Sequence, residues 1–146
     1  MITNEVQRRS TEAHLRRFEE AFANLEAKIG PRERSKLSQL EIDAVRAQAD
    51  DLRAELDEYD QVRSGAISTF EASSVAELAT LHIKARIARG LTQRQLADIL
   101  GVAEQQVQRY EATGYRSASL ARIGDIATAL DVTITERLSL SGPDAA

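Results

Sequence analysis

Several residue types on which common functional sites depend are missing or scarce in this 146-residue chain. It has no cysteine, which excludes disulfide bridges and thiolate metal sites. Its two histidines, His14 and His82, lie too far apart for the usual ligand spacing. The sequence also lacks a Ser-His-Asp grouping and a glycine-rich phosphate loop. We therefore expect no metal, no cofactor and no enzymatic activity.

The chain also lacks the features of secreted and membrane proteins. It has no run of about 18 apolar residues, and its first residues do not follow the basic-then-apolar pattern of a signal peptide. We expect a soluble, cytoplasmic protein without a membrane partner. Proline occurs only at positions 31 and 143 and aromatic residues are few, whereas Ala, Leu, Glu, Arg and Gln are abundant. This composition favours an all-α fold.

The formal net charge of −4 is unevenly distributed. Residues 1–74 carry a net charge of −4 and residues 75–137 a net charge of +1. The acidic excess therefore belongs to the front half, and a nucleic acid would be bound by locally placed arginines of the back half, not by bulk attraction.

The first 65 residues contain two long amphipathic periods. From about Asn4 to Ile29, apolar residues recur at steps of three and four, which predicts a helix. Gly30-Pro31 ends this helix, a polar connection follows, and Ser38 with Glu41 forms a capping box that opens a second helix. The second helix closes at Ser64-Gly65.

Two such helices predict a long antiparallel, coiled-coil-like hairpin at 1–65. A thin hairpin leaves a residual apolar seam, which we expect to pack against a second copy or a partner protein; the alternative is that it folds back and shares one core with the rest of the chain. The acidic run at 41–60 is interpreted as a solvated face, with a DNA-mimicking strip or a docking strip for a basic partner as the alternative. The expected seam consists of Leu15, Phe18, Phe22, Leu25, Ile29, Val45, Leu52, Leu56 and Tyr59.

Residues 66–74 are a plausible hinge anchored by Ile67 and Phe70, and 75–138 form the next predicted unit. Ser74 and Glu77 form a capping box, so a helix should start at Val75. Later, Ser117 or Ser119 caps a further helix, and Val132, Ile134 and Leu138 finish the core. Residues 139–146 are expected to form a disordered tail.

The stretch from Leu91 to Glu111 predicts two short helices joined by a tight turn. Thr92 is a good N-cap, and Gly101 supplies the left-handed conformation that ends the first helix. In the second helix Val107 and Tyr110 point inward. Two helices around a glycine turn, the second rich in amides and arginine, form the layout of a DNA-reading helix-turn-helix.

Several motifs together resemble the XRE family of Cro and phage-repressor-type DNA-binding domains over about residues 75–135. They are Arg86–Gln93, Gln95–Ala97, Leu100–Val102 and Arg109–Glu111. The resemblance implies a lambda-repressor-like fold, binding to double-stranded DNA and, more often than activation, repression. Ala103 departs from the pattern, because a Ser or Thr often caps the recognition helix at this position.

The chemistry of the second helix suggests how bases would be read. Gln105 can contact adenine, Arg109 guanine and Glu104 the cytosine amine. The family resemblance selects Glu104, Gln105, Gln108 and Arg109 as base-reading candidates, whereas Glu111 is expected to pair with a neighbouring arginine.

Other residues are candidates for contacts with the DNA backbone. By resemblance, Gln93 matches the position that clamps a phosphate, and the helix N-terminus adds partial positive charge there. Further phosphate-contacting candidates are Thr92, Arg94, Tyr115, Arg116 and Ser117.

These observations lead to two hypotheses. The first is a sequence-specific transcriptional regulator, a homodimeric repressor that reads the major groove with helix 103–111. The second is an antitoxin or adaptor whose hairpin binds a toxin or other protein partner and whose DNA binding serves autoregulation.

Overall fold

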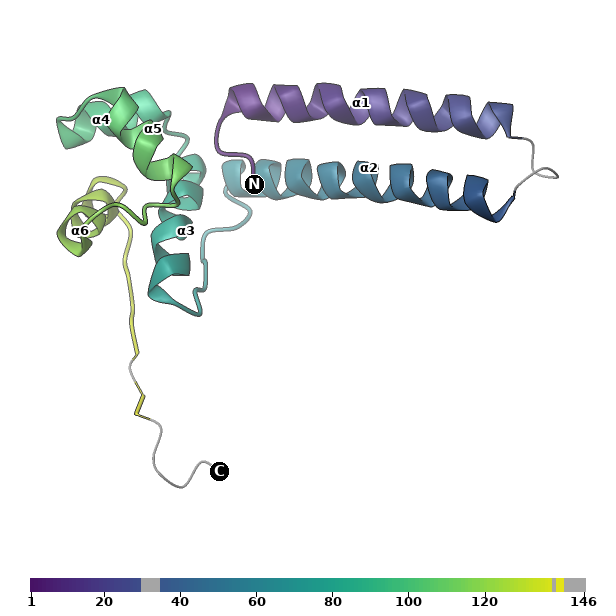
Figure 1. Ribbon diagram of the computed structural model, residues 1–146. Coiled ribbons are helices and arrows are strands. Elements are labelled where there is room, and N and C mark those ends of the chain that lie inside the picture. Colours follow the sequence, from purple (N-terminus) through teal and green to yellow (C-terminus); the bar gives the residue numbers. More distant parts are fainter. Residues whose placement is uncertain (30–34, 138, 141–146) are drawn as a thin grey trace.

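The computed structural model describes residues 1–29, 35–137, 139 and 140. In these residues it has six helices and no strand, which confirms the predicted all-α fold. Figure 1 shows a long two-helix arm, α1 and α2, that projects from a cluster formed by α3 to α6. None of the described helices combines the length and the apolar character needed to cross a membrane.

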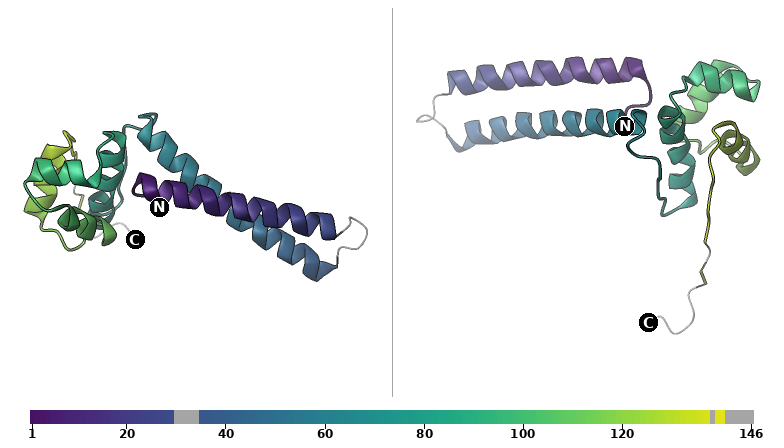
Figure 2. Two further views of the ribbon diagram at one scale, coloured as in Figure 1. Left: turned by 90° about the horizontal axis from the view of Figure 1, so that it is seen from above. Right: turned by 180° about the vertical axis from the view of Figure 1, so that it is seen from behind.

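The arm is the predicted antiparallel hairpin of α1 (Glu5–Lys28) and α2 (Lys36–Arg63), which lie side by side in the views of Figures 1 and 2. At about 1.5 Å per residue the helices are about 36 and 42 Å long. The predicted end of α2 is confirmed, because Ser64 is its C-cap and Gly65 follows with φ +76°. The predicted end of α1 at Gly30-Pro31 lies outside the described residues.

The predicted start of α2 is wrong by one turn. Its N-cap is Ser35, whose side chain accepts a hydrogen bond from the Ser38 amide at 3.1 Å. The Ser38 hydroxyl is paired with that of Ser35 at 2.9 Å, so Ser38 lies inside the helix and does not form the expected box with Glu41. Two serines three residues apart offer two possible caps, and the earlier one is used.

The hairpin covers its apolar stripes only in part. No residue of α1 is buried, whereas Ile42 and Ala49 of α2 are 0% and 4% exposed. Arg46 lies over the Phe22 ring, with 5.2 Å from guanidinium carbon to ring centroid. Much of the expected seam therefore remains half-buried in one chain, namely Leu15, Phe18, Phe22, Leu25, Ile29, Val45 and Leu52.

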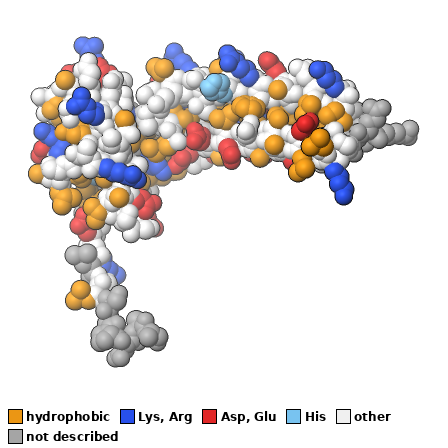
Figure 3. Space-filling view, viewed as in Figure 1, with side chains coloured by type: hydrophobic (Ala, Val, Ile, Leu, Met, Phe, Trp, Pro, Cys, Tyr) orange, Lys and Arg blue, Asp and Glu red, His pale blue; other side chains and the backbone are white. Residues whose placement is uncertain are grey.

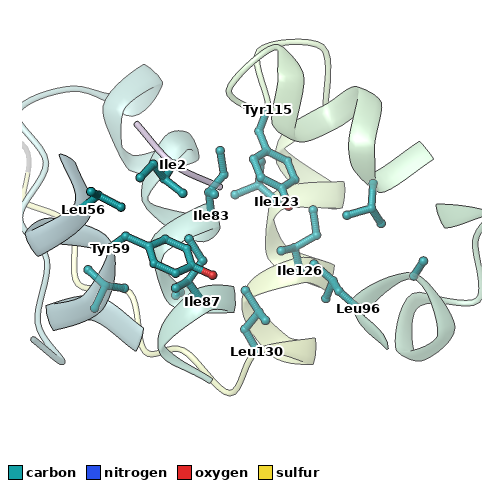
Figure 4. Close-up of a cluster of buried hydrophobic side chains, with 14 residues drawn as sticks. Ile2, Leu56, Tyr59, Ile83, Ile87, Leu96, Tyr115, Ile123, Ile126 and Leu130 are labelled. Atoms are coloured by element: carbon teal, nitrogen blue, oxygen red, sulfur yellow. The ribbon is translucent and has the colours of Figure 1, made fainter. Parts of the chain in front are cut away.

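The base of the hairpin belongs to the main hydrophobic core. Leu56 and Tyr59 were expected at a seam with another molecule, but they are 9% and 4% exposed and join Ile2, Ile83 and others in one cluster (Figure 4). Helical periodicity places them on the apolar face of α2 but does not say which neighbour covers it. The alternative of a shared core is thus correct for this end of the hairpin, while the distal part projects away.

A short linker leads from the hairpin to α3 (Val75–Ala88). Ile67 and Phe70 are half-buried against the core, as expected of its anchors. The predicted helix start is confirmed: the Ser74 side chain accepts from the Glu77 amide at 3.2 Å. The Glu77 carboxylate accepts from the amide of Ser73 at 2.8 Å, one residue before the cap.

The rest of the cluster consists of α4 (Gln93–Leu100), α5 (Glu104–Ala112) and α6 (Leu120–Ala129), the last capped by Ser119. After α6 the chain is extended, and Val132 and Ile134 are half-buried. Leu138 and most of the expected disordered tail, residues 141–146, lie outside the described residues. The buried side chains that join these helices to α3 are Ile83, Ile87, Leu96, Val107, Ile123, Ile126 and Leu130.

Candidate nucleic-acid interface

Helices α4 and α5 form the predicted helix-turn-helix. Thr92 and Gln95 make a reciprocal capping box at the start of α4, with bonds of 3.1 and 2.8 Å. Gly101 ends α4 at φ +67°, a left-handed conformation that costs other residues free energy. Ala103 precedes α5 and provides no side-chain cap, so the first amides of α5 lack this partner.

The outer face of α5 carries the four base-reading candidates. Gln105, Gln108 and Arg109 are exposed and Glu104 is half-buried. Gln108 Nε2 donates to Glu104 Oε1 at 3.2 Å, which links two candidates along one face of the helix. The Arg109 guanidinium makes no hydrogen bond or ion pair with another described residue, so all its donors are available to a ligand.

The inner face of α5 is fixed by a buried ion pair. Glu111 accepts from Arg86 Nε at 2.5 Å and from Arg86 Nη2 at 2.8 Å. The two side chains are only 2% and 3% exposed. A bidentate pair of planar groups restricts rotation as well as distance, so it holds α5 against α3 and confirms the expected pairing of Glu111 with an arginine.

The same network reaches Gln93 at the start of α4. Gln93 Nε2 donates to Glu111 Oε2 at 2.7 Å, which orients the amide expected to clamp a phosphate. Arg86 also donates from Nη1 to the backbone carbonyl of Leu91 at 2.7 Å and from Nη2 to that of Thr3 at 2.6 Å. The first residues of the chain therefore contact the group that orients both helices of the motif.

Four of the six phosphate-contacting candidates lie at the surface. Thr92, Arg94, Arg116 and Ser117 are exposed, and Gln93 is half-buried. Figure 3 shows Lys and Arg side chains spread over the visible face of the helical cluster, not concentrated in one large patch. Local placement of single cations is therefore the relevant electrostatic feature.

Tyr115 corrects the expectation of a backbone contact. Its side chain is 1% exposed and stacks on Tyr110, with ring centroids 6.0 Å apart (Figure 4 shows Tyr115 within the core). Burial, and secondarily the Glu111 carboxylate, raise the pKa of its phenol above the ordinary value, so it stays neutral. Its backbone has φ +61°, and this left-handed turn directs the ring inward.

Two features of the site were not predicted from the sequence. Arg86 belongs to one of the motifs that carry the family resemblance, but the sequence did not predict its role at the centre of the hydrogen-bond network. The Thr3 carbonyl lies 83 positions from Arg86 in the sequence, and no local pattern signals that contact.

Comparison with known proteins agrees with this geometry. Residues 83–137 match a family model described as Helix-turn-helix, of the XRE type. The match contains α4, α5 and α6 and leaves the hairpin outside it. No curated protein and no solved structure matches the chain.

Proposed function

Because residues 83–137 are an XRE-family helix-turn-helix domain in a DNA-binding regulator of transcription, we propose that this chain recognises a specific operator by inserting α5 into the major groove. The proposal depends mainly on one observation: α5 has an exposed polar face on one side and packs against the core on the other. Val107 is 1% exposed and Glu111 is held by Arg86, while Gln105 and Arg109 point to solvent.

The chemistry of that face suits base edges. An arginine bidentate to guanine or a glutamine bidentate to adenine discriminates against a wrong base by about 1–3 kcal/mol. Glu104 accepts from Gln108, so its carboxylate is partly satisfied and is the weakest of the four candidates. We assign the main reading roles to Gln105 and Arg109.

Contacts to phosphates position α5 without reading sequence. Gln93 is proposed to clamp one phosphate with its second Nε2 proton and the helix amides, since its first proton is used by Glu111. Thr92, Arg94, Arg116 and Ser117 are proposed to contact neighbouring phosphates. The Thr92 hydroxyl accepts within the capping box and can still donate outward.

We further propose that the protein acts as a homodimeric repressor. Operators with two-fold symmetry present half-sites about one helical turn apart, and two copies of α5 related by a two-fold axis match them.

Fluorescence anisotropy with labelled duplexes tests the proposal. Duplexes are first selected from a randomised pool by the wild-type chain, and the affinity of each variant is then measured on the selected and on a scrambled sequence. The double variant Gln105→Ala, Arg109→Ala should lose the preference for the selected duplex. The matched double variant Gln48→Ala, Arg17→Ala, which removes exposed hairpin residues, should retain it. Equal behaviour of the two double variants would refute the assignment.

One observation favours the second candidate function, an antitoxin or adaptor. The hairpin keeps a half-buried apolar stripe, and Leu37 and Leu40 near the start of α2 are 68% and 66% exposed. Figure 3 shows hydrophobic side chains along the visible face of the arm. Contiguous exposed apolar surface is typical of a protein interaction site.

Co-expression distinguishes the candidates. If the hairpin binds the product of the adjacent reading frame, the two proteins should co-purify. The double variant Leu37→Ser, Leu40→Ser should no longer co-purify with that product. A wild-type chain that purifies without the co-expressed protein would argue against the antitoxin or adaptor function.

A further inference from the structure

Positive and negative charges are segregated within the hairpin. Residues 6–18 of α1 contain four arginines and one acid, whereas α2 contains four basic and eight acidic residues. The one acid, Glu12, accepts from Arg8 at 3.3 Å, and Arg8 also donates to Asp60 of α2 at 2.8 and 2.9 Å. The first half of α1 is therefore cationic in a hairpin that is acidic as a whole. The other three arginines of this segment, called the α1 arginines below, are Arg9, Arg16 and Arg17.

The α1 arginines lie on the outer face of the arm and are all exposed. Helical spacing places them away from the half-buried stripe that contains Phe18 and faces α2. Arg9 approaches only Glu5, at 3.6 Å, and its side chain is 77% accessible. Arg16 and Arg17 make no hydrogen bond or ion pair with another described residue. Since an exposed ion pair is weak, all three guanidinium groups are available to an external anion.

The outer face of α1 points to the same side of the molecule as the outer face of α5. Figure 1 shows α1 above α2, and α4 and α5 above α6 and most of α3; the view from behind in Figure 2 agrees. Because α5 turns Val107 and Glu111 toward the core, its polar face is directed upward in these views. Because α1 turns its apolar stripe toward α2, its arginines are directed upward as well. A duplex that contacts α5 therefore lies on the side of the arm that carries the α1 arginines.

The α1 arginines are also near the helix-turn-helix along the arm. The Thr3 carbonyl accepts from Arg86, the centre of the network that supports α5, so α1 begins beside the motif. At about 1.5 Å per residue, Arg9 and Arg17 lie about 6 and 18 Å along the helix from its first residue. Beyond them the outer face carries the exposed Glu20. Positive charge thus lies on the half of α1 that is closest to the base-reading helix.

We propose that Arg9, Arg16 and Arg17 form a second DNA-contacting surface, which binds phosphates of the duplex beside the segment read by α5. The proposal rests on the proposed function, because it requires α5 to dock on DNA. Guanidinium groups bind phosphate oxygens in a bidentate manner, and such contacts position a protein without reading sequence. The interface then extends from the matched domain, residues 83–137, to the hairpin.

The chemistry of this face favours a nucleic acid over an acidic protein. The centre of a protein interface is depleted of charge and rich in apolar side chains. The structure describes α1 throughout, and Val6 is its only exposed large apolar residue. Between the α1 arginines the outer positions are the small residues Ser10 and Ala13. The exposed Leu37 and Leu40 belong to α2 and form a separate surface, which remains available to a protein partner.

The salt dependence of DNA binding tests the phosphate contacts. The logarithm of the association constant falls against the logarithm of the salt concentration by about 0.9 per neutralised phosphate. Fluorescence anisotropy is measured with the selected duplex, flanked on each side by about one helical turn of arbitrary sequence. Arg16→Gln should reduce the steepness of this line by about 1, and the triple variant Arg9→Gln, Arg16→Gln, Arg17→Gln should reduce it by about 3.

Lys36→Gln is the matched control for Arg16→Gln. It changes the net charge equally, but Lys36 is the exposed first residue of α2, at the far end of the arm (Figure 1). Its slope should equal that of the wild type, and an equal slope in Arg16→Gln would overturn the proposal. The triple variant should lose affinity for selected and scrambled duplexes alike and keep its preference between them. Loss of Arg17 alone should likewise leave that preference unchanged.

Directed cleavage of the DNA tests the position of the arm, because the chain has no cysteine of its own. Ala13→Cys places one thiol among the α1 arginines, and Ala54→Cys places one on the exposed face of α2 at a similar distance from the helical cluster. Each thiol is labelled with an iron chelate that cleaves nearby DNA backbone. We expect cleavage beside the segment read by α5 from position 13 and none from position 54. The same result from both positions would overturn the proposal.

Failure of this proposal is distinguishable from failure of the proposed function. If the selected duplex is preferred through Arg109, while the triple variant keeps the wild-type slope and position 13 gives no cleavage, only the second surface is wrong. If the chain prefers no duplex, the proposed function fails and the second surface fails with it. Both surfaces are supported if the Arg109 variant loses base preference and the α1 arginine variants lose only affinity and salt dependence.

Discussion

Replacing Glu111 with alanine should lower the free energy of unfolding by about 3 kcal/mol. The change leaves the Arg86 guanidinium, 3% exposed, without its counter-charge and with two donors unpaired. Breaking a buried pair in this way costs about 3–5 kcal/mol. We place the value at the lower end, because the carbonyls of Leu91 and Thr3 still accept from Arg86. A loss of this size is a large part of the total stability of about 5–15 kcal/mol typical of small proteins.

Urea unfolding followed by circular dichroism measures the effect, and a double variant isolates its cause. Arg86→Met combined with Glu111→Leu removes both charges and should be less destabilised than Glu111→Ala alone, since no unpaired charge is left in the core. A loss below about 1 kcal/mol in Glu111→Ala, or a double variant less stable than that single variant, would refute the reasoning.

Three further predictions follow from individual contacts. Ala103→Ser should raise the stability by about 0.5–1 kcal/mol in thermal unfolding, because it supplies the missing cap of α5; no gain would show that the amides are already satisfied. Ile2→Asn should lower the free energy of unfolding, measured in urea, by about 2–3 kcal/mol. The control Val6→Asn, at a residue 78% exposed, should lower it by less than about 0.5 kcal/mol. Similar losses in the two variants would contradict the docking of the first residues in the core. The Arg8 guanidinium holds the pKa of Asp60 below its ordinary value. The pair therefore stabilises the hairpin at neutral pH, and this stabilisation is lost as the pH falls below about 4. In Asp60→Asn, the free energy of unfolding measured against pH should lack this acid-dependent loss.

Local signals in the sequence predicted the helices and most of their ends. Thr92, Gly101 and Ser74 act through neighbours within a few residues, so their roles can be recognised from spacing alone. Ser35 and Ser38 show the limit of such signals. Both are residue types that favour the N-cap position, and the helix starts after the earlier one, which the residue types alone do not decide.

Contacts between distant segments were not accessible in the same way. The inward direction of Tyr115 depends on a left-handed turn and on the aromatic stack with Tyr110. Leu56 and Tyr59 were correctly placed on the apolar face of α2, but the core that covers them includes Ile2 and Ile83 from elsewhere in the chain. Periodicity predicts that a face is buried and does not identify its partner.

The exposed part of the candidate interface was easier to predict than its support. Gln105, Gln108 and Arg109 lie on the outer face because Val107 must point inward, a consequence of helical spacing. The Arg86 network that orients Gln93 joins four parts of the chain: the first residues, α3, the start of α4 and α5. Sequence spacing alone contains no information about that meeting point.

Selection of duplexes from a randomised pool, followed by sequencing, tests the central claim most directly. With Arg109→Ala, the enriched sequences should lose their preference at one position per half-site and keep it elsewhere, a change of about 1–3 kcal/mol at that position. With Gln93→Ala, affinity should fall for all sequences alike while the enriched sequence stays the same. Unchanged base preferences in Arg109→Ala, or a shifted preference in Gln93→Ala, would contradict the proposal that α5 reads the bases and the start of α4 holds the backbone.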